Sequence, residues 1–189
     1  MLRLNHVVAA FLAVMLASAG WAAGDDRADT QNAEVVELLQ ELAEPEQARW
    51  QRLERRIIRL WSQSGSASAD LLLQRGRDAL RTGNTAAAIE HLTALVDHAP
   101  DFAEGYHTRA TAFFMANQYG PAMIDIQETL RRNPDHFGAL SGMGVILEEL
   151  KLRDAALDAY RAAHAIHPHR PDIKRALERL ERQMDGLSL

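Results

Sequence analysis

Apolar residues recur at three- and four-residue steps through residues 69–170, which is the spacing of one face of an α-helix. Pro100, Pro134 and Pro168 interrupt this pattern at intervals of 34 residues. A proline ring removes a backbone donor and clashes with the preceding helical turn, so each proline marks the end of a helix. A period of this length is typical of an array of stacked helical hairpins.

Three windows, 69–102, 103–136 and 137–170, match one another beyond the prolines. Two antiparallel helices approach closely only where side chains are small, and small residues fill the eighth and twentieth positions of every window. Large apolar residues fill the fourth and twenty-fourth positions, where they predict contacts with the neighbouring helix. The small residues are Gly76, Ala110, Gly144, Ala88, Ala122 and Ala156, and the large ones are Leu72, Tyr106, Leu140, Leu92, Ile126 and Tyr160.

This combination of small, large and proline positions resembles the tetratricopeptide repeat family, and the resemblance covers residues 69–170. It implies an all-α fold, an α-solenoid of three helix-turn-helix repeats over the three windows. Gly83-Asn84-Thr85 predicts the turn between the two helices of the first repeat. Ser68 is the expected N-terminal cap of the first of these helices.

Position seven departs from the family, which usually has leucine there, because this chain has Arg75 and Arg109. In the structural interpretation, each aliphatic stem packs between helices while the guanidinium meets carboxylates or carbonyl groups. In the functional interpretation, the two arginines are cations at the edge of a ligand groove.

Two further apolar stripes predict an N-terminal helical hairpin over residues 33–63, either a cap or a decayed repeat. Its second half carries arginines beside Trp50 and Trp61. These form either a docking surface for an acidic partner or anionic lipid, or a solvated face paired with Glu46 and Glu54 while the tryptophans pack on the first repeat. The arginines are Arg49, Arg52, Arg55, Arg56 and Arg59.

The two ends of the chain have simpler patterns. Residues 171–185 have one apolar face and predict a C-terminal capping helix. Residues 1–23 carry Arg3, an apolar run and then small residues, the order of a cleaved secretory signal peptide, and the polar residues 24–32 predict a flexible spacer. We therefore expect a periplasmic protein that contacts the membrane only through its leader, if the leader is not cleaved.

Composition and missing motifs argue against several classes of function. The net charge of −5 argues against nucleic acid as a partner, and the absence of cysteine excludes a catalytic thiol or a thiolate zinc site. No phosphate-binding loop, His-Glu-x-x-His or nucleophile-elbow motif is present, so we expect no enzymatic activity and no cofactor.

Histidines give only a weak indication of metal binding. His164, His167 and His169 could bind a divalent metal, but Pro168 interrupts the helix between them, and we favour separate histidines. His91, His98, His107 and His136 are scattered along the sequence and predict nothing individually. A metal-binding protein or an enzyme built on the array therefore stays an alternative.

In the family, the first helices of successive repeats line a concave groove that holds a peptide segment or a helix of another protein. The resemblance implies a non-catalytic scaffold or adaptor, and together with the predicted leader it predicts a role in the bacterial cell envelope. A structural, self-associating envelope component is the other alternative. Some relatives clamp a terminal carboxylate with basic and amide side chains, but here those positions hold Leu73, Arg77, Thr108, Gly138 and Gly142. The expected groove residues are Leu73, Gln74, Arg77, Leu80, Arg81, His107, Thr108, Thr111, Phe114, Met115, Ser141 and Val145.

Overall fold

The structure is a computed structural model that describes residues 30–185. The predicted signal peptide, residues 1–23, and residues 24–29 of the predicted spacer lie outside the described residues. The chain divides between Leu38 and Leu39 into two units, and a helix over residues 30–43 spans that boundary. The expectation of a spacer as far as residue 32 is wrong, because residues 30–32 already belong to this helix.

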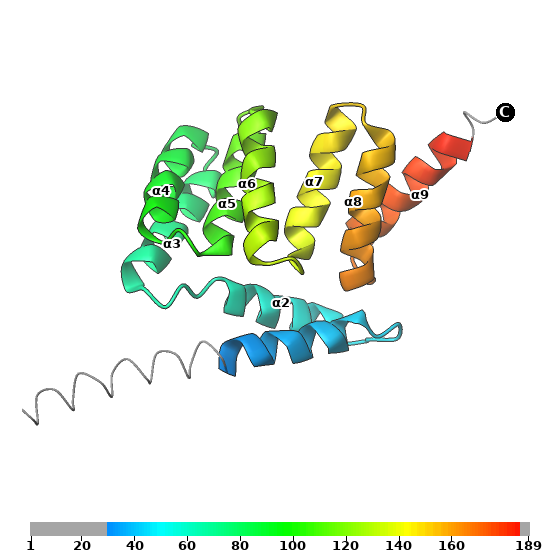
Figure 1. The fold of residues 1–189 in the computed structure, drawn as a ribbon, viewed down its shortest axis with the longest axis horizontal. Coiled ribbons are helices and arrows are strands. Elements are labelled where there is room, and N and C mark those ends of the chain that lie inside the picture. The colour runs from blue at the N-terminus through cyan, green and yellow to red at the C-terminus, as the bar shows by residue number, and fades with distance from the viewer. Residues whose placement is uncertain (1–29, 186–189) are drawn as a thin grey trace, which may run out of the picture. The chain divides into compact units, whose positions relative to one another are not determined.

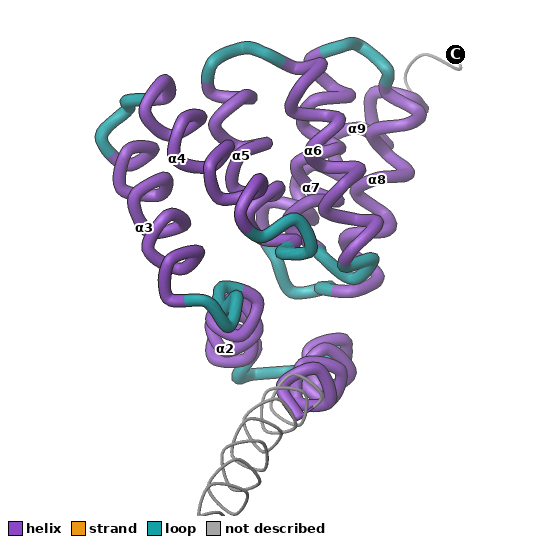
Figure 2. The backbone as a smooth tube through the Cα atoms, turned by 60° about the vertical axis from the view of Figure 1, so that its left-hand side comes forward, coloured by secondary structure: helices purple, strands orange, loops and turns teal. Residues whose placement is uncertain are grey.

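Within the described residues, the second unit consists of helices joined by short turns (Figure 1). Seen from a second direction, the helices lie beside one another and the turns lie at their ends (Figure 2). None of the described helices combines the length and apolar character that crossing a bilayer requires. The helices are α2 (Trp50–Trp61), α3 (Ala67–Arg81), α4 (Thr85–His98), α5 (Ala103–Met115), α6 (Tyr119–Arg132), α7 (Phe137–Glu149), α8 (Arg153–Ile166) and α9 (Pro171–Asp185).

Three apolar clusters join the helix pairs α3–α4, α5–α6 and α7–α8 into one array. The first cluster contains side chains of α3 and α4 with Ala112 of α5, and the second contains side chains of α5 and α6 with Ala139 and Ile146 of α7. The third contains α8 and α9, with partly buried side chains of α7 packed against it. Each repeat therefore shares its core with the next element, and the predicted all-α solenoid is confirmed.

The small residues at position eight allow each helix pair to close. A Cβ atom added to Gly76 would lie 2.5 Å from Leu92, and one added to Gly144 would lie 2.8 Å from the ring of Tyr160. Both partners are buried, and the Tyr160 hydroxyl donates a hydrogen bond to Glu148 Oε1 at 2.8 Å, so its ring cannot retreat easily. The predicted close approach of the paired helices is therefore confirmed at these two positions.

The turn inside each repeat has the same backbone geometry. Position fifteen of the three windows is Gly83, Asn117 and Lys151, and their φ angles are 74°, 58° and 64°. In each turn the following amide donates to a carbonyl five residues back, as in the hydrogen-bonding pattern that ends many helices. A left-handed residue therefore reverses the chain three times, although only the first is a glycine.

One capping prediction is wrong. Ser66, not Ser68, caps α3, and its hydroxyl accepts a hydrogen bond from the amide of Ala69. The Ser68 hydroxyl instead lies 2.8 Å from His98 Nε2, near the end of α4. The helix starts one residue after Ser66, so its first turn includes Ser68.

The two arginines at position seven have different surroundings. Arg109 donates from Nε and Nη2 to the two carboxylate oxygens of Asp125 at 2.7 and 2.8 Å, and its guanidinium lies over the rings of Tyr106 and Phe113. The structural interpretation is confirmed for Arg109. It is wrong for Arg75, which is exposed.

Helix α2 lies across the ends of several repeat helices, as Figure 1 shows. The ring of Trp61 stacks on that of His136 with centroids 4.6 Å apart, and Trp50 meets the edge of His167 at 5.6 Å. The expectation that the tryptophans pack on the first repeat is therefore wrong. Glu54, which we expected to pair with arginines of its own helix, lies near His167 and Arg170 instead.

Gly144→Ala should destabilise the protein by about 1–3 kcal/mol, because its Cβ has no room beside Tyr160. Gly142→Ala is the control on the same helix. Its Cβ would meet Ile126 at an ordinary 3.7 Å, and alanine favours helix over glycine by up to about 1 kcal/mol. Urea unfolding of both variants measures the difference, and equal stabilities would contradict the packing of α7 on α8.

Asp125→Ala should cost about 3 kcal/mol of unfolding free energy, because it leaves the guanidinium of Arg109 largely buried without its carboxylate. The control is Asp78→Ala, which removes the partner of exposed Arg81 and should change stability by less than about 0.5 kcal/mol. Thermal and urea unfolding check both values. A small loss for Asp125→Ala would show that Arg109 reaches water or another partner.

Candidate partner-binding groove

A half-open pocket lies between α5 and α7, the first helices of the second and third repeats. Its volume is about 110 Å³, and almost all of its lining is apolar. Ile126 of α6 lies behind it, and Gly142 leaves space because it has no side chain. The other lining residues are His107, Ala110, Thr111, Phe114, Val145 and Ile146.

Four of the predicted groove residues meet in this pocket: His107, Thr111, Phe114 and Val145. Met115, Gln74 and Arg81 are exposed, and Arg77, Leu80 and Ser141 are half-buried. None of these six lines the pocket. The pocket contains predicted groove residues of the second and third repeats, and a binding groove that extends over the first repeat stays a prediction.

Two of the predicted groove residues are buried and offer no surface to a partner. Leu73 is 2% exposed, because it packs among α3, α4 and Ala112 of α5. Thr108 is 5% exposed, and its hydroxyl lies 3.5 Å from Glu104 Oε1 on the same helix. Their prediction as groove-lining residues is wrong for this reason.

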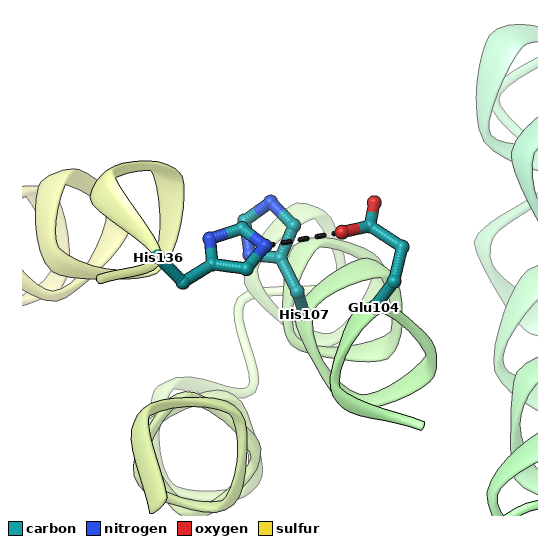
Figure 3. Close-up of side chains that lie close together, drawn as sticks. All are labelled: Glu104, His107 and His136. Carbon is teal, nitrogen blue, oxygen red and sulfur yellow. Dashed lines mark hydrogen bonds and ion pairs between the residues drawn. The ribbon is translucent and has the colours of Figure 1, made fainter. Parts of the chain in front are cut away.

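A buried polar cluster adjoins the pocket at His107. It consists of Glu104, His107 and His136, whose candidate ligand atoms lie within 4.8 Å of one another (Figure 3). Glu104 and His107 come from the first turns of α5, and His136 caps α7. The scattered-histidine prediction is wrong for His107 and His136, whose ring centroids are 4.3 Å apart.

Hydrogen bonds determine the protonation of this cluster. The amide of Ala139 donates to Nδ1 of His136 at 3.1 Å, so the neutral ring carries its proton on Nε2. That nitrogen then donates to Glu104 Oε2 at 3.0 Å, while Arg77 pairs with Oε1. A buried carboxylate is thereby satisfied by one partner from the first repeat and by the residue that caps α7.

The pKa values of the cluster follow from burial and these contacts. Burial would raise the pKa of Glu104, but the hydrogen bond from His136, the two neighbouring imidazoles and the charge of Arg77 lower it to about 2. Burial, together with the neighbouring His136, lowers the pKa of His107 to about 3. Glu104 is therefore ionised and His107 neutral at physiological pH. His107 Nδ1 is buried and accepts no hydrogen bond from the described residues.

The C-terminal histidines do not form a metal site within the described residues. His167 is fully buried and meets the edges of Trp50 and Phe137, while His169 Nε2 donates to the carbonyl oxygen of Glu44 at 2.8 Å. The group of metal-binding geometry found in residues 30–185 is the Glu104 cluster. Sequence offered one signal for it, because Glu104 and His107 are three residues apart on one helix face.

Shared repeat cores, close-packed glycines and a groove on the first helices define the class of fold: this chain is an α-solenoid of tetratricopeptide repeats. It is 38% identical over 112 residues to a TPR repeat-containing protein of Rhizobium etli, covering 59% of this chain and 55% of that relative. It is 28% identical over 120 residues to the Protein SGT1 homolog of Bos taurus, covering 64% of this chain and 36% of that one. The chain thus spans about half or less of these relatives' length, and no protein-family model matches it.

Solved structures show the same fold at low sequence identity. The first TPR of Spaghetti (RPAP3), bound to an HSP90 peptide, matches with a TM-score of 0.61 at 21% identity, covering 64% of this chain and 95% of that one. The Sgt2 TPR domain from Aspergillus fumigatus matches with a TM-score of 0.61 at 22% identity, over 65% and 83% of the two chains. The TPR2B domain of yeast Sti1, in a pHsp70 complex, matches with a TM-score of 0.58 at 20% identity, over 62% and 99%.

The cluster makes stability depend on pH in a defined direction. His107 has a lowered pKa in the folded state, so acidification below its ordinary value of 6.5 protonates the unfolded chain first and favours unfolding. Between pH 7 and pH 5, His107 should therefore cost about 2 kcal/mol of stability. Glu104, whose folded pKa is also lowered, adds a further loss only below about pH 4.5, its ordinary range.

The measurement is urea unfolding from pH 7.5 to pH 5 of the wild type and of His107→Gln. The variant should lose stability less steeply over this interval, by about 2 kcal/mol in total. His98→Gln is the control, because His98 is exposed. If the stability of wild type and of His107→Gln fell equally with pH, His107 would be protonated as easily in the folded protein as in the unfolded chain, which would contradict the prediction.

Proposed function

We propose that this protein is a non-catalytic scaffold that binds a segment of another protein in the groove between α5 and α7. The observation that carries the proposal is the apolar pocket between the first helices of the second and third repeats. An apolar pocket of about 110 Å³ can take one branched or aromatic side chain, since an engineered cavity of about 150 Å³ holds benzene.

The form of the pocket favours a peptide or helix as the ligand. An apolar lining gains affinity by burying an apolar side chain of the ligand. Thr111 and His107 are the lining residues that carry polar side-chain groups. A side chain inserted there would act as an anchor, and the backbone around it would run along the exposed surfaces of α5 and α7.

The peptide complexes among the structural neighbours support this proposal. The RPAP3 domain is bound to an HSP90 peptide, and the Sti1 domain is in a complex with pHsp70. This chain lacks most of the side chains with which some family members clamp a terminal carboxylate, and Gly142 stands at one of those positions. Its ligand is therefore an internal apolar segment rather than a charged chain end.

We place the scaffold in the periplasm of a bacterial cell. The support for this placement is the signal-peptide pattern of residues 1–23, with its basic start, short apolar run and small residues. Similarity to the Rhizobium etli protein supports a bacterial type. Fractionation of cells that express the tagged full chain tests the location, since recovery in the cytoplasm would contradict it.

Gly142→Leu should block partner binding without unfolding the protein. The new side chain would occupy the pocket, while the helix gains from the loss of glycine. Peptides are first selected on the immobilised wild-type chain, and their affinities for the variants are then measured by fluorescence anisotropy. We expect Gly142→Leu to bind at least ~10-fold more weakly, a loss of about 1.4 kcal/mol.

Gly142→Ala is the matched control, because a methyl group fits the space beside Ile126 and leaves most of the pocket open. It should bind the selected peptides nearly as well as the wild type. Crosslinked recovery of partners from envelope extract with the same three proteins extends the test to natural ligands. Equal binding by all three would move the binding surface away from the pocket.

A further inference from the structure

We propose that Glu104, His107 and His136 form a binding site for a divalent transition-metal ion, best suited to Zn²⁺. This inference does not depend on the proposed function. The three side chains offer two imidazole nitrogens and a carboxylate oxygen, a donor set that suits zinc and leaves a fourth coordination position open. They are brought together from two elements, α5 and the residue before α7.

The distances between the donor atoms are close to those that zinc requires. His136 Nε2 lies 3.0 Å from Glu104 Oε2, and one candidate donor atom from each of the three residues lies within 4.8 Å of the other two. Bonds of about 2.0–2.1 Å in a tetrahedral site place neighbouring ligand atoms about 3.3 Å apart. Donor atoms that lie farther apart than this must move closer together to hold the ion.

The charge states also match those of metal ligands. A metal ion binds a neutral imidazole and an ionised carboxylate. The pKa values of Glu104 and His107, both below the physiological range, keep these two groups in that form. His107 Nδ1 is a buried nitrogen that none of the described groups satisfies, and a buried atom of this kind is costly unless something binds it.

Two features of the cluster work against metal binding and set its strength. Coordination through His136 Nε2 transfers the ring proton to Nδ1, so the hydrogen bond from the Ala139 amide is lost. The positive charge of Arg77 repels the cation, although Arg77 pairs with Oε1 and leaves Oε2 for the metal. In return, Arg77 fixes the carboxylate in place, as outer partners do at metal sites.

The pocket gives the ion a route to the cluster. His107 belongs to both, since it lines the pocket and lies against His136. On another side the ring of Trp61 stacks on His136. An ion that reached the site through the groove would couple metal binding to whatever occupies the pocket.

The test is calorimetric titration of the metal-stripped full chain with Zn²⁺ alone. The wild type should bind one equivalent, and Glu104→Gln and His107→Gln should each weaken binding at least ~100-fold. His98→Gln should bind as the wild type does. Absence of binding, or equal binding by all four proteins, would overturn the proposal.

A second measurement needs no variant and therefore holds even if the substitutions disturb folding. X-ray absorption of the zinc-loaded wild type should show two imidazole nitrogens in the coordination shell together with oxygen ligands. A shell with fewer than two imidazoles would overturn the proposal, because the cluster supplies two. The Co²⁺-loaded wild type should show the intense visible absorption of four-coordinate cobalt, and the weak absorption of six-coordinate cobalt would contradict the site.

Discussion

The buried carboxylate of Glu104 is the constraint on which the arrangement of the repeats depends. A charge that is only 6% exposed must be paired, and its partners come from elsewhere in the chain. Arg77 belongs to the first repeat, Glu104 to the second, and His136 is the residue before the third. One acidic group therefore sets the relative positions of α3, α5 and α7, the helices that border the groove. The same contacts hold His107 at the pocket wall.

The fold was predictable because the information for it is local and periodic. Gly76 and Gly144 occupy equivalent positions, and both mark places where a second helix comes too near for a side chain. The same register places Gly83, Asn117 and Lys151 at the left-handed turn, although only the glycine would have predicted that conformation from the sequence. Agreement among spacing, small residues and prolines left few alternative folds.

The candidate site was predictable only in part, since it depends on side-chain directions that a period does not encode. Phe114 and Val145 were expected at the groove and line its pocket, whereas Leu73, at an equally typical position, turns into the core. The pairing of Glu104 with His136 joins the first and last turns of one 34-residue window, and neither residue is marked by a motif. The path of α2 was also hidden, because amphipathic spacing shows which face of a helix is buried but not what covers it.

That path changes how the array can deform. In an ordinary solenoid each repeat contacts only its neighbours, so the curvature of the array can change. Here α2 contacts several repeats at once. Ser62, at the end of α2, accepts a hydrogen bond from Arg77 in the first repeat. Trp61 stacks on His136 at the junction of the second and third repeats, and Trp50 stacks on His169 just before α9. A helix with contacts at both of its ends resists changes in the curvature of the repeats that it spans. We therefore expect the groove to keep one width and the repeats to unfold together rather than one at a time.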